Sequence, residues 1–150
     1  MDEKTKLEDI KMDDKTRDNI LDEYLSLHHL YLSTGEKGIK FSFKEIRREH
    51  PSFTLEGADL KSEDLRFADL SVSNLSKADL SKANLSRANL SKTDLSYTNF
   101  SNANLEYANF IYAKALRANF RYADLNHADM NYVDFEESNF MHADIGYAKS

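Results

Sequence analysis

Large apolar residues recur at every fifth position over most of this chain. From Leu60 to Ile145 the spacing holds without an insertion, and only Ala115 is small at an apolar place. We number the five positions so that the apolar residue is third. The first is then usually Ala or Thr, and the second is Asp or Asn in every quintet except that of Lys114. A period of five fits neither a helix nor a strand, and it predicts a solenoid over residues 58–147 in which each quintet forms one side of a coil.

Quintets such as ADLSK and ANLSR resemble the A(D/N)LXX consensus of the pentapeptide-repeat family. The resemblance implies an all-β solenoid, namely a right-handed quadrilateral β-helix of about four and a half coils with a small α-helical N-terminal cap. With four quintets to a coil, residues twenty apart stack at a strand spacing of ~4.8 Å. The expected inward columns are Leu60–Leu80–Phe100–Phe120–Phe140, Leu65–Leu85–Leu105–Leu125–Ile145, Leu70–Leu90–Phe110–Met130 and Leu75–Leu95–Ala115–Phe135.

The chain before the quintets predicts two helices, so we divide it into a helical N-terminal cap, 1–52, and a β-helix, 53–150. The first helix is expected over residues 15–33, with Asp14 as its N-cap and Gly35 as its stop. The second is expected after a capping box formed by Ser42 and Glu45, and to end before Pro51. Four apolar side chains are expected to plug the first coil: Phe41, Phe43, Ile46 and Phe53.

The segment LSLHHLYLSTGEKGIKFSF also resembles the leader of bacterial and bacteriophage members of the family. In that comparison Phe41 and Phe43 replace the usual small and leucine pair, and an insertion of seven to ten residues follows. At the other end, Phe135, Phe140 and Ile145 have no following coil in this sequence. Either the sequence stops early, or this end pairs with a second copy, as the resemblance to quinolone-resistance proteins implies. We expect a C-terminal dimer.

The exterior changes character along the predicted rod. Its fifth positions carry a ring of Lys and Arg over residues 77–92 and tyrosines farther on. Stacked tyrosines support neighbouring strands, and tyrosine is also a frequent anchor at protein interfaces. Both interpretations stay open, and under the second the contact surface comprises Tyr107, Ile111, Tyr112, Leu116 and Tyr132.

Residues 122–147 contain no Lys or Arg. Their acidic side chains form a second candidate surface: Asp124, Asp129, Asp134, Glu136, Glu137 and Asp144. The family resemblance implies imitation of DNA by such an acidic rod. The alternative for the second-position aspartates is structural, because short polar side chains bond to the backbone at turns.

The composition excludes several other functions. A net charge of −6 argues against direct nucleic-acid binding, which normally needs a basic surface. Because His28 and His29 are adjacent, they diverge on a helix, and we expect no metal site. No catalytic constellation is recognisable, so we expect neither enzymatic activity nor a bound cofactor. With no cysteine, no apolar run long enough for a membrane span and no signal-peptide pattern, a cytoplasmic location is expected.

Two functional hypotheses follow. The first is a non-catalytic binding protein that inhibits or modulates a DNA-processing enzyme, such as gyrase or a phage-defence nuclease complex, by imitating DNA. The second is an interaction module in which the rod is a scaffold and the N-terminal helix carries the specificity. Both imply a protein partner.

Overall fold

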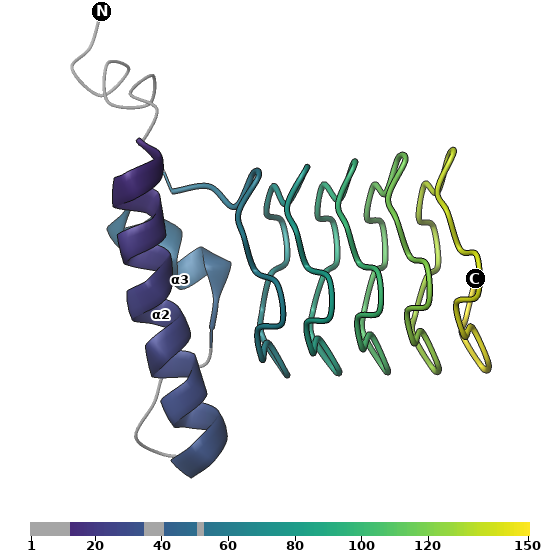
Figure 1. Cartoon of the computed structure of the whole chain (residues 1–150), viewed down its shortest axis with the longest axis horizontal. Helices are drawn as coiled ribbons and strands as arrows, with labels where there is room; N and C mark the ends of the chain where they lie inside the picture. The colour runs from purple at the N-terminus through teal and green to yellow at the C-terminus, as the bar shows by residue number, and fades with distance from the viewer. Residues whose placement is uncertain (1–12, 35–40, 51–52) are drawn as a thin grey trace, which may run out of the picture.

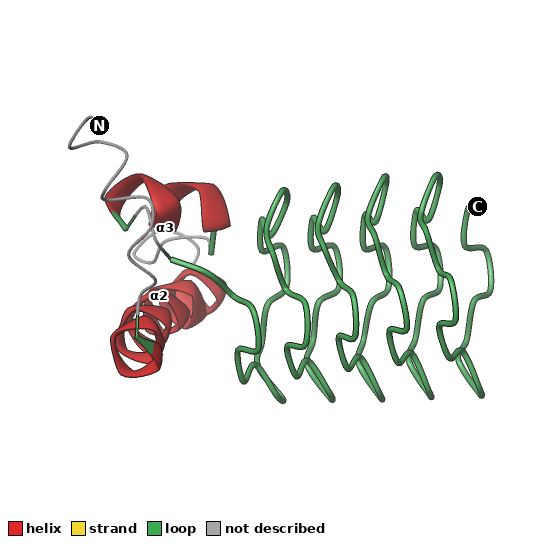
Figure 2. Cartoon of the chain, turned by 90° about the horizontal axis from the view of Figure 1, so that it is seen from above, coloured by secondary structure: helices red, strands yellow, loops and turns green. Residues whose placement is uncertain are grey.

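The computed structural model describes residues 13–34, 41–50 and 53–150. Two helices, α2 (Asp14–Thr34) and α3 (Phe43–Glu49), lie at one end of a rod of stacked coils. The C-terminus lies at the other end (Figure 1), and the view from above shows the same row of coils beside the helices (Figure 2).

The coils repeat every twenty residues. Parallel bridges join second-position residues of successive coils, from Asp59 with Asp79 to Asp129 with Lys149. Four quintets therefore make one coil, as the family resemblance implied. Each side contributes a single bridge between turns, so the solenoid is built from isolated bridges rather than long strands.

Every backbone N–H of a typical quintet has a partner, as the quintet from Ala78 to Lys82 illustrates. The first N–H closes the corner onto the Leu75 carbonyl at 3.0 Å, and the second donates to the preceding coil. The third and fifth donate to the following coil at 2.8 and 2.9 Å. The fourth, that of Ser81, donates to the Asp79 carboxylate at 2.9 Å. The second-position side chain is thus the acceptor that completes the turn, which supports the structural interpretation of Asp and Asn.

Each corner needs a left-handed residue at the fifth position. Eighteen non-glycine residues in the described chain have φ between +54° and +62°, and all of them are fifth-position residues of successive quintets. Together with the hydrogen bond from the next first position to the third carbonyl, this is a type II turn. Such a turn points the fifth side chain away from the rod.

The core follows the expected inward columns. Phe120 stacks between Phe100 and Phe140, with ring centroids 5.0 and 4.8 Å away. It also meets Phe110 and Phe135 edge to face at 6.1 and 5.9 Å. These aromatic rings surround the part of the core where Ala115, fully buried, contributes only a methyl group.

The chain enters the solenoid through residues 41–43. Ser42 bridges Asp69, 27 residues on rather than 20, so seven extra residues are accommodated before the quintets begin. Phe41 and Phe43 take the first and third positions of this entry side, and their bonds to Asp69 are 2.8 and 2.9 Å. Phe41, Phe43, Ile46 and Phe53 are all buried, as expected.

Two details of the predicted caps are wrong. Asp13, not Asp14, caps α2, since its carboxylate accepts the Thr16 N–H at 2.9 Å and the Thr16 hydroxyl at 2.8 Å. Ser42 is the N-cap of α3 but makes no side-chain cap bond, so the capping box with Glu45 does not form. The extended backbone of Ser42 is instead held by its bridge to the solenoid. Gly35 and Pro51, predicted as boundaries, lie outside the described residues.

Several polar contacts tie α2 to its neighbours. Tyr24 donates a hydrogen bond to Glu49 of α3 at 2.7 Å, and buried His28 accepts one from the Phe41 N–H through Nδ1 at 2.9 Å. Arg17 donates to the Glu56 carbonyl of the first coil at 3.1 Å. Leu21 and Leu25 add buried apolar contacts on the same side of α2.

The aromatic core can be tested at Phe120. Replacing Phe120 with Ala removes a ring that contacts four others, and we expect the free energy of unfolding to fall by about 3–5 kcal/mol. Urea denaturation measures this change. Met141→Ala, an exposed position on the same side, serves as the control and should stay within about 0.5 kcal/mol of the parent. Equal losses for both variants would contradict the core described here.

The hydrogen bond between Tyr24 of α2 and Glu49 of α3 should be lost at alkaline pH. Burial and the bond to Glu49 raise the pKa of Tyr24, which is 9% exposed, to about 12. The folded state therefore holds this proton more tightly than the unfolded state does. The stabilisation is complete below about pH 10, the ordinary tyrosine pKa, and is lost as pH rises towards 12.

The Tyr24→Phe variant has no hydroxyl to titrate, so comparing it with the parent isolates the contribution of the Tyr24 hydroxyl to stability. We expect the variant to be about 1 kcal/mol less stable than the parent at pH 9. The difference should shrink as pH rises above 10, as followed by urea midpoints. A difference that stays constant across this range would show that Tyr24 does not titrate as described.

Candidate protein-docking surfaces

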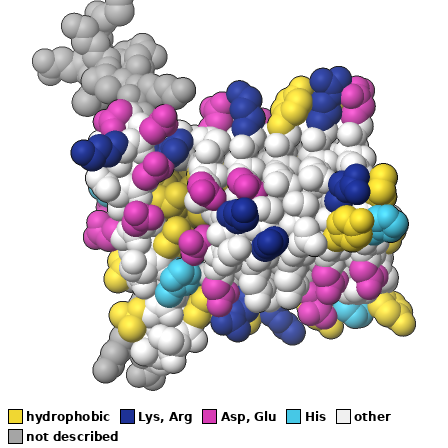
Figure 3. Space-filling view, in the orientation of Figure 1, with side chains coloured by type: hydrophobic (Ala, Val, Ile, Leu, Met, Phe, Trp, Pro, Cys, Tyr) yellow, Lys and Arg dark blue, Asp and Glu magenta, His cyan; other side chains and the backbone are white. Residues whose placement is uncertain are grey.

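The side chains that project from the rod belong to the fifth positions. They form four columns, one along each corner, with residues twenty apart in the chain. In Figure 3 charged, histidine and hydrophobic side chains gather in rows along the rod, and uncharged surface lies between the rows. Fourth-position side chains are mostly half-buried, and Ser81 and Ser96 are buried.

One corner carries a continuous stack of a cation and three rings. The Arg87 guanidinium lies 4.8 Å from the centroid of Tyr107, which stacks on His127 at 4.6 Å. His127 stacks in turn on Tyr147 at 5.0 Å. Each ring restricts the rotamers of the next, so the stack presents a pre-ordered, largely exposed aromatic edge.

A second corner brings together three of the five residues predicted for the aromatic contact surface. Tyr112 stacks on Tyr132 at 4.9 Å, and Ile111 is half-buried in the same turn as Tyr112. Tyr107 and Leu116 lie on the two neighbouring corners. A third ladder, Tyr122 on His142 at 4.9 Å, was not among the predicted site residues.

The quintet of residues 113–117 departs from the repeat chemistry. Lys114 replaces the second-position acceptor, Ala115 replaces the large apolar residue, and Leu116 stands at the fourth position. Within the described chain the Leu116 N–H donates no hydrogen bond, whereas its counterparts in neighbouring quintets bond to Asp or Asn. Departures from a structural rule are expected where function competes with it.

The six predicted acidic residues encircle the last coils. The four aspartates occupy second positions, and each accepts the fourth N–H of its own quintet at 3.0–3.3 Å: Asp124, Asp129, Asp134 and Asp144. Glu136 and Glu137 lie together in one corner turn. The acidic residues are therefore spread over three sides rather than gathered on one face.

Two of these carboxylates have lowered pKa values. Arg117 pairs with Glu137 at 2.7 and 3.1 Å, and this contact lowers the pKa of the glutamate. A hydrogen bond from Asn126 and another from the Gly146 N–H lower the pKa of Asp144. Both side chains are thus charged at neutral pH, and the charge of Glu137 is partly offset by Arg117.

The C-terminal end exposes the edge of the last coil. Phe135 and Phe140 are half-buried and Ile145 is 54% exposed, whereas their counterparts one coil earlier are buried. The N–H groups of these three residues donate no hydrogen bond within the described residues, although their counterparts all bond to the following coil. Another solenoid coil could satisfy these donors.

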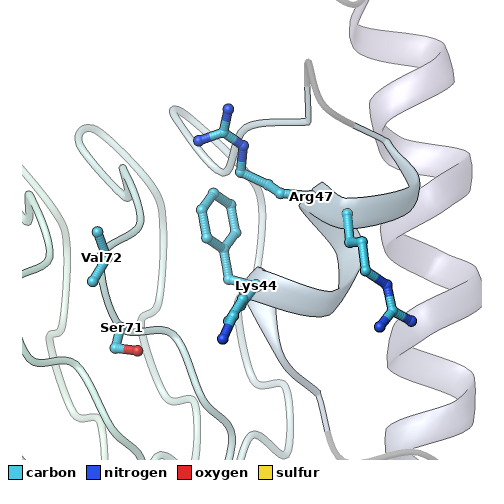
Figure 4. A pocket seen from close by; sticks show the side chains of 6 residues that line it. Lys44, Arg47, Ser71 and Val72 are labelled. Atoms are coloured by element: carbon cyan, nitrogen blue, oxygen red, sulfur yellow. The ribbon is translucent and has the colours of Figure 1, made fainter.

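A groove that the sequence did not predict lies between α3 and the first coils. It has a volume of ≈460 Å³ and is lined by Phe43, Lys44, Arg47, Arg48, Ser71 and Val72. Lys44 and Arg47 reach into it from α3, and Ser71 and Val72 face them from the solenoid (Figure 4). Spacing alone could not reveal this groove, because it arises where the seven-residue insertion folds back on the rod.

A second hollow of ≈480 Å³ lies between α2 and the first coil. Its polar side chains contact one another: His29 lies 3.2 Å from Glu63, and Arg66 pairs with Asp64 at 2.7 Å. The hydrogen bond from Arg66 lowers the pKa of Asp64. Among the described residues, no group of three His, Cys, Asp or Glu side chains is placed to hold a metal ion.

A rod of stacked quintet coils with helices at one end defines this molecule as a β-solenoid repeat protein. The family model described as "Pentapeptide repeats (8 copies)" matches three stretches of the chain, residues 54–87, 83–115 and 118–149. The chain therefore belongs to the pentapeptide-repeat family, whose members fold as right-handed quadrilateral β-helices. No helix in the described part of the chain is long and apolar enough to span a membrane.

Two solved structures illustrate the similarity. HetL, a pentapeptide repeat protein involved in heterocyst differentiation regulation in the cyanobacterium Nostoc sp. strain PCC 7120, is 30% identical with a TM-score of 0.63. The match covers 72% of this chain but only 46% of HetL. A pentapeptide repeat protein from the Arabidopsis thaliana thylakoid lumen is 22% identical with a TM-score of 0.60, over 63% of this chain and 66% of that one. No curated protein matches the chain in sequence.

Proposed function

We propose that this chain is a non-catalytic, cytoplasmic binding protein whose C-terminal half docks a protein partner. The observation that carries the proposal is the set of exposed, stacked rings on three corners, with centroids 4.6–5.0 Å apart. Tyr132 and Tyr147 are 76% and 82% exposed, so most of their ring surface is available to a partner. Pre-ordered tyrosines lose little entropy on binding and are common interface anchors.

The position of the irregular quintet supports the same surface. Ile111, Leu116 and the exposed ring of Tyr112 lie at or beside the quintet that departs from the repeat. We take Tyr107, Ile111, Tyr112, Leu116 and Tyr132 as its aromatic and apolar part. The structural similarity to HetL, a protein involved in regulation, is consistent with a binding or modulating role.

The finer proposal is that the partner is an enzyme that grips nucleic acid, and that the acidic end imitates DNA. Glu136, Glu137 and the four second-position aspartates supply negative charge around the last coils. The Arg117 pair and the basic ring of residues 77–92 limit this field to the C-terminal end. Gyrase or a phage-defence nuclease complex is the kind of target that such a surface would block.

In the second candidate function, the rod of residues 53–150, with about four and a half coils, serves as a scaffold. Specificity then resides in the helical cap of residues 1–52. The bonds from Tyr24 and His28, which fix α2 against α3 and the entry side, favour this alternative because they hold the helical part rigidly on the rod. The two functions use opposite ends and can be separated experimentally.

Capture of partners from a bacterial lysate at low and moderate salt tests the DNA-mimic proposal. We expect a nucleic-acid-handling enzyme to be retained, and retention to weaken as salt rises. Glu136→Lys with Glu137→Lys should abolish retention, because the two charges are reversed. The fold should be kept, since neither side chain accepts a turn hydrogen bond. Asp134→Asn removes one charge but keeps the oxygen that accepts the Glu136 N–H, so it should weaken retention less than the double reversal does.

Three results discriminate between the proposals. Loss of the partner on Glu136 and Glu137 reversal supports mimicry. Loss only on Tyr112→Ser with Tyr132→Ser assigns binding to the aromatic corner without DNA mimicry. A partner retained by all these variants and insensitive to salt contradicts docking by the C-terminal half and favours the helical cap.

We also propose that Phe135, Phe140 and Ile145 form a dimer end. A second copy placed end to end would cover these side chains and pair the unused N–H groups. Light scattering at micromolar concentration should give twice the monomer mass of 17.3 kDa. Ile145→Asp should restore the monomer, whereas Met141→Ser, exposed on an outer face, should not. A monomeric parent protein would rule out the dimer.

A further inference from the structure

The groove beside α3 combines cations with an apolar wall. Lys44 and Arg47 are exposed along one edge of the helix, and the Arg47 guanidinium lies 5.9 Å from the centre of the Phe43 ring. Opposite them stand the methyl groups of Val72 and the Ser71 hydroxyl, which donates to Asp69 at 2.6 Å. A third cation, Arg48, also lines the groove and is paired with Glu45 at 3.0 Å.

Val72 is an unusual residue for its place. Among the eighteen non-glycine corner residues with positive φ in the described chain, it is the one β-branched side chain. Its φ is +58°, a region in which branching at Cβ is sterically unfavourable. It is nevertheless 67% exposed, so burial in the core does not offset this cost. An exposed β-branched residue that stands against its backbone preference at the wall of a groove indicates a binding role.

We propose that this groove binds an acidic peptide segment of a partner protein. Carboxylates of the peptide pair with Lys44 and Arg47, and an apolar side chain packs between Val72 and the Phe43–Arg47 contact. Charge complementarity selects the anionic peptide. The apolar wall distinguishes it from free phosphate, which would use the cations alone. The volume of ≈460 Å³ accommodates a few side chains.

Nearby charges disfavour a nucleic acid as the occupant. Asp69 lies behind Ser71, Glu45 is next to Lys44, and the whole chain carries a net charge of −6. A polyanionic backbone that extends beyond the groove would meet these carboxylates, whereas a short peptide touches only the two cations. The inference does not depend on docking at the C-terminal half, because the groove lies at the other end of the rod (Figures 1 and 4).

The test uses the full chain and a displayed library of random eight-residue peptides. The library is selected on the parent protein after depletion on the double variant Lys44→Glu, Arg47→Glu. We expect the enriched peptides to combine Asp or Glu with Leu, Ile or Phe. No enrichment, or enrichment of basic or purely polar peptides, would overturn the proposal.

The most enriched peptide is then synthesised with a fluorescent label for anisotropy. Its Kd should rise about tenfold or more with Lys44→Glu, Arg47→Glu. The matched control Lys61→Glu, Lys82→Glu makes the same charge change at exposed positions on another corner of the rod and should change the Kd by less than about twofold. Equal weakening by both pairs would mean non-specific charge attraction and would refute the groove.

Val72→Asn supplies an independent readout. Asparagine tolerates positive φ, so the melting temperature should stay equal or rise. Peptide affinity should nevertheless fall, because the apolar wall is lost. This combination separates a binding role from a structural one. A variant that binds the peptide as tightly as the parent shows that Val72 does not contact it and contradicts the proposed site.

Discussion

The structure depends on one constraint, which is that every backbone N–H of a five-residue side must find an acceptor while the chain turns a corner. Three of the five bond to neighbouring coils and one closes the turn. The remaining N–H, at the fourth position, donates to the side chain of the second position, as the Ser81 N–H does to Asp79. Buried or half-buried N–H groups are costly to leave unpaired, so Asp or Asn recurs. The sequence period is the period of this hydrogen-bond arrangement.

The same constraint determines where function can be carried. First and third positions fill the core, and second positions complete the turns. Only the fourth and fifth positions can vary, and the type II turn directs the fifth outwards at every corner. Because residues twenty apart stack, aromatic side chains at equivalent fifth positions form ladders such as Tyr107–His127–Tyr147. A partner of this protein would therefore meet aligned rows of side chains rather than a cleft.

Counting in fives predicted the solenoid and its register, and the twenty-residue coil that the family resemblance implies predicted the inward columns and the stacking of tyrosines. The sequence predicted less well the helical segment before the quintets and its junction with the rod. The cap of α2 shifts by one residue to Asp13, and Ser42 is held by its bridge to Asp69 instead of a capping box. The groove of Lys44, Arg47 and Val72 was missed, because it depends on how α3 packs against the rod. No repeat encodes that contact.

The constraint also sorts the acidic residues of the C-terminal end. A second-position aspartate cannot be judged by its charge alone, since Asp124, Asp129, Asp134 and Asp144 each complete a turn. Replacing one with Lys would remove a turn acceptor as well as a charge, so lost binding would not identify a contact. Glu136 and Glu137 occupy positions that the fold leaves open. Their carboxylates were not needed to build the coil, and the case for a negatively charged docking surface therefore depends on them.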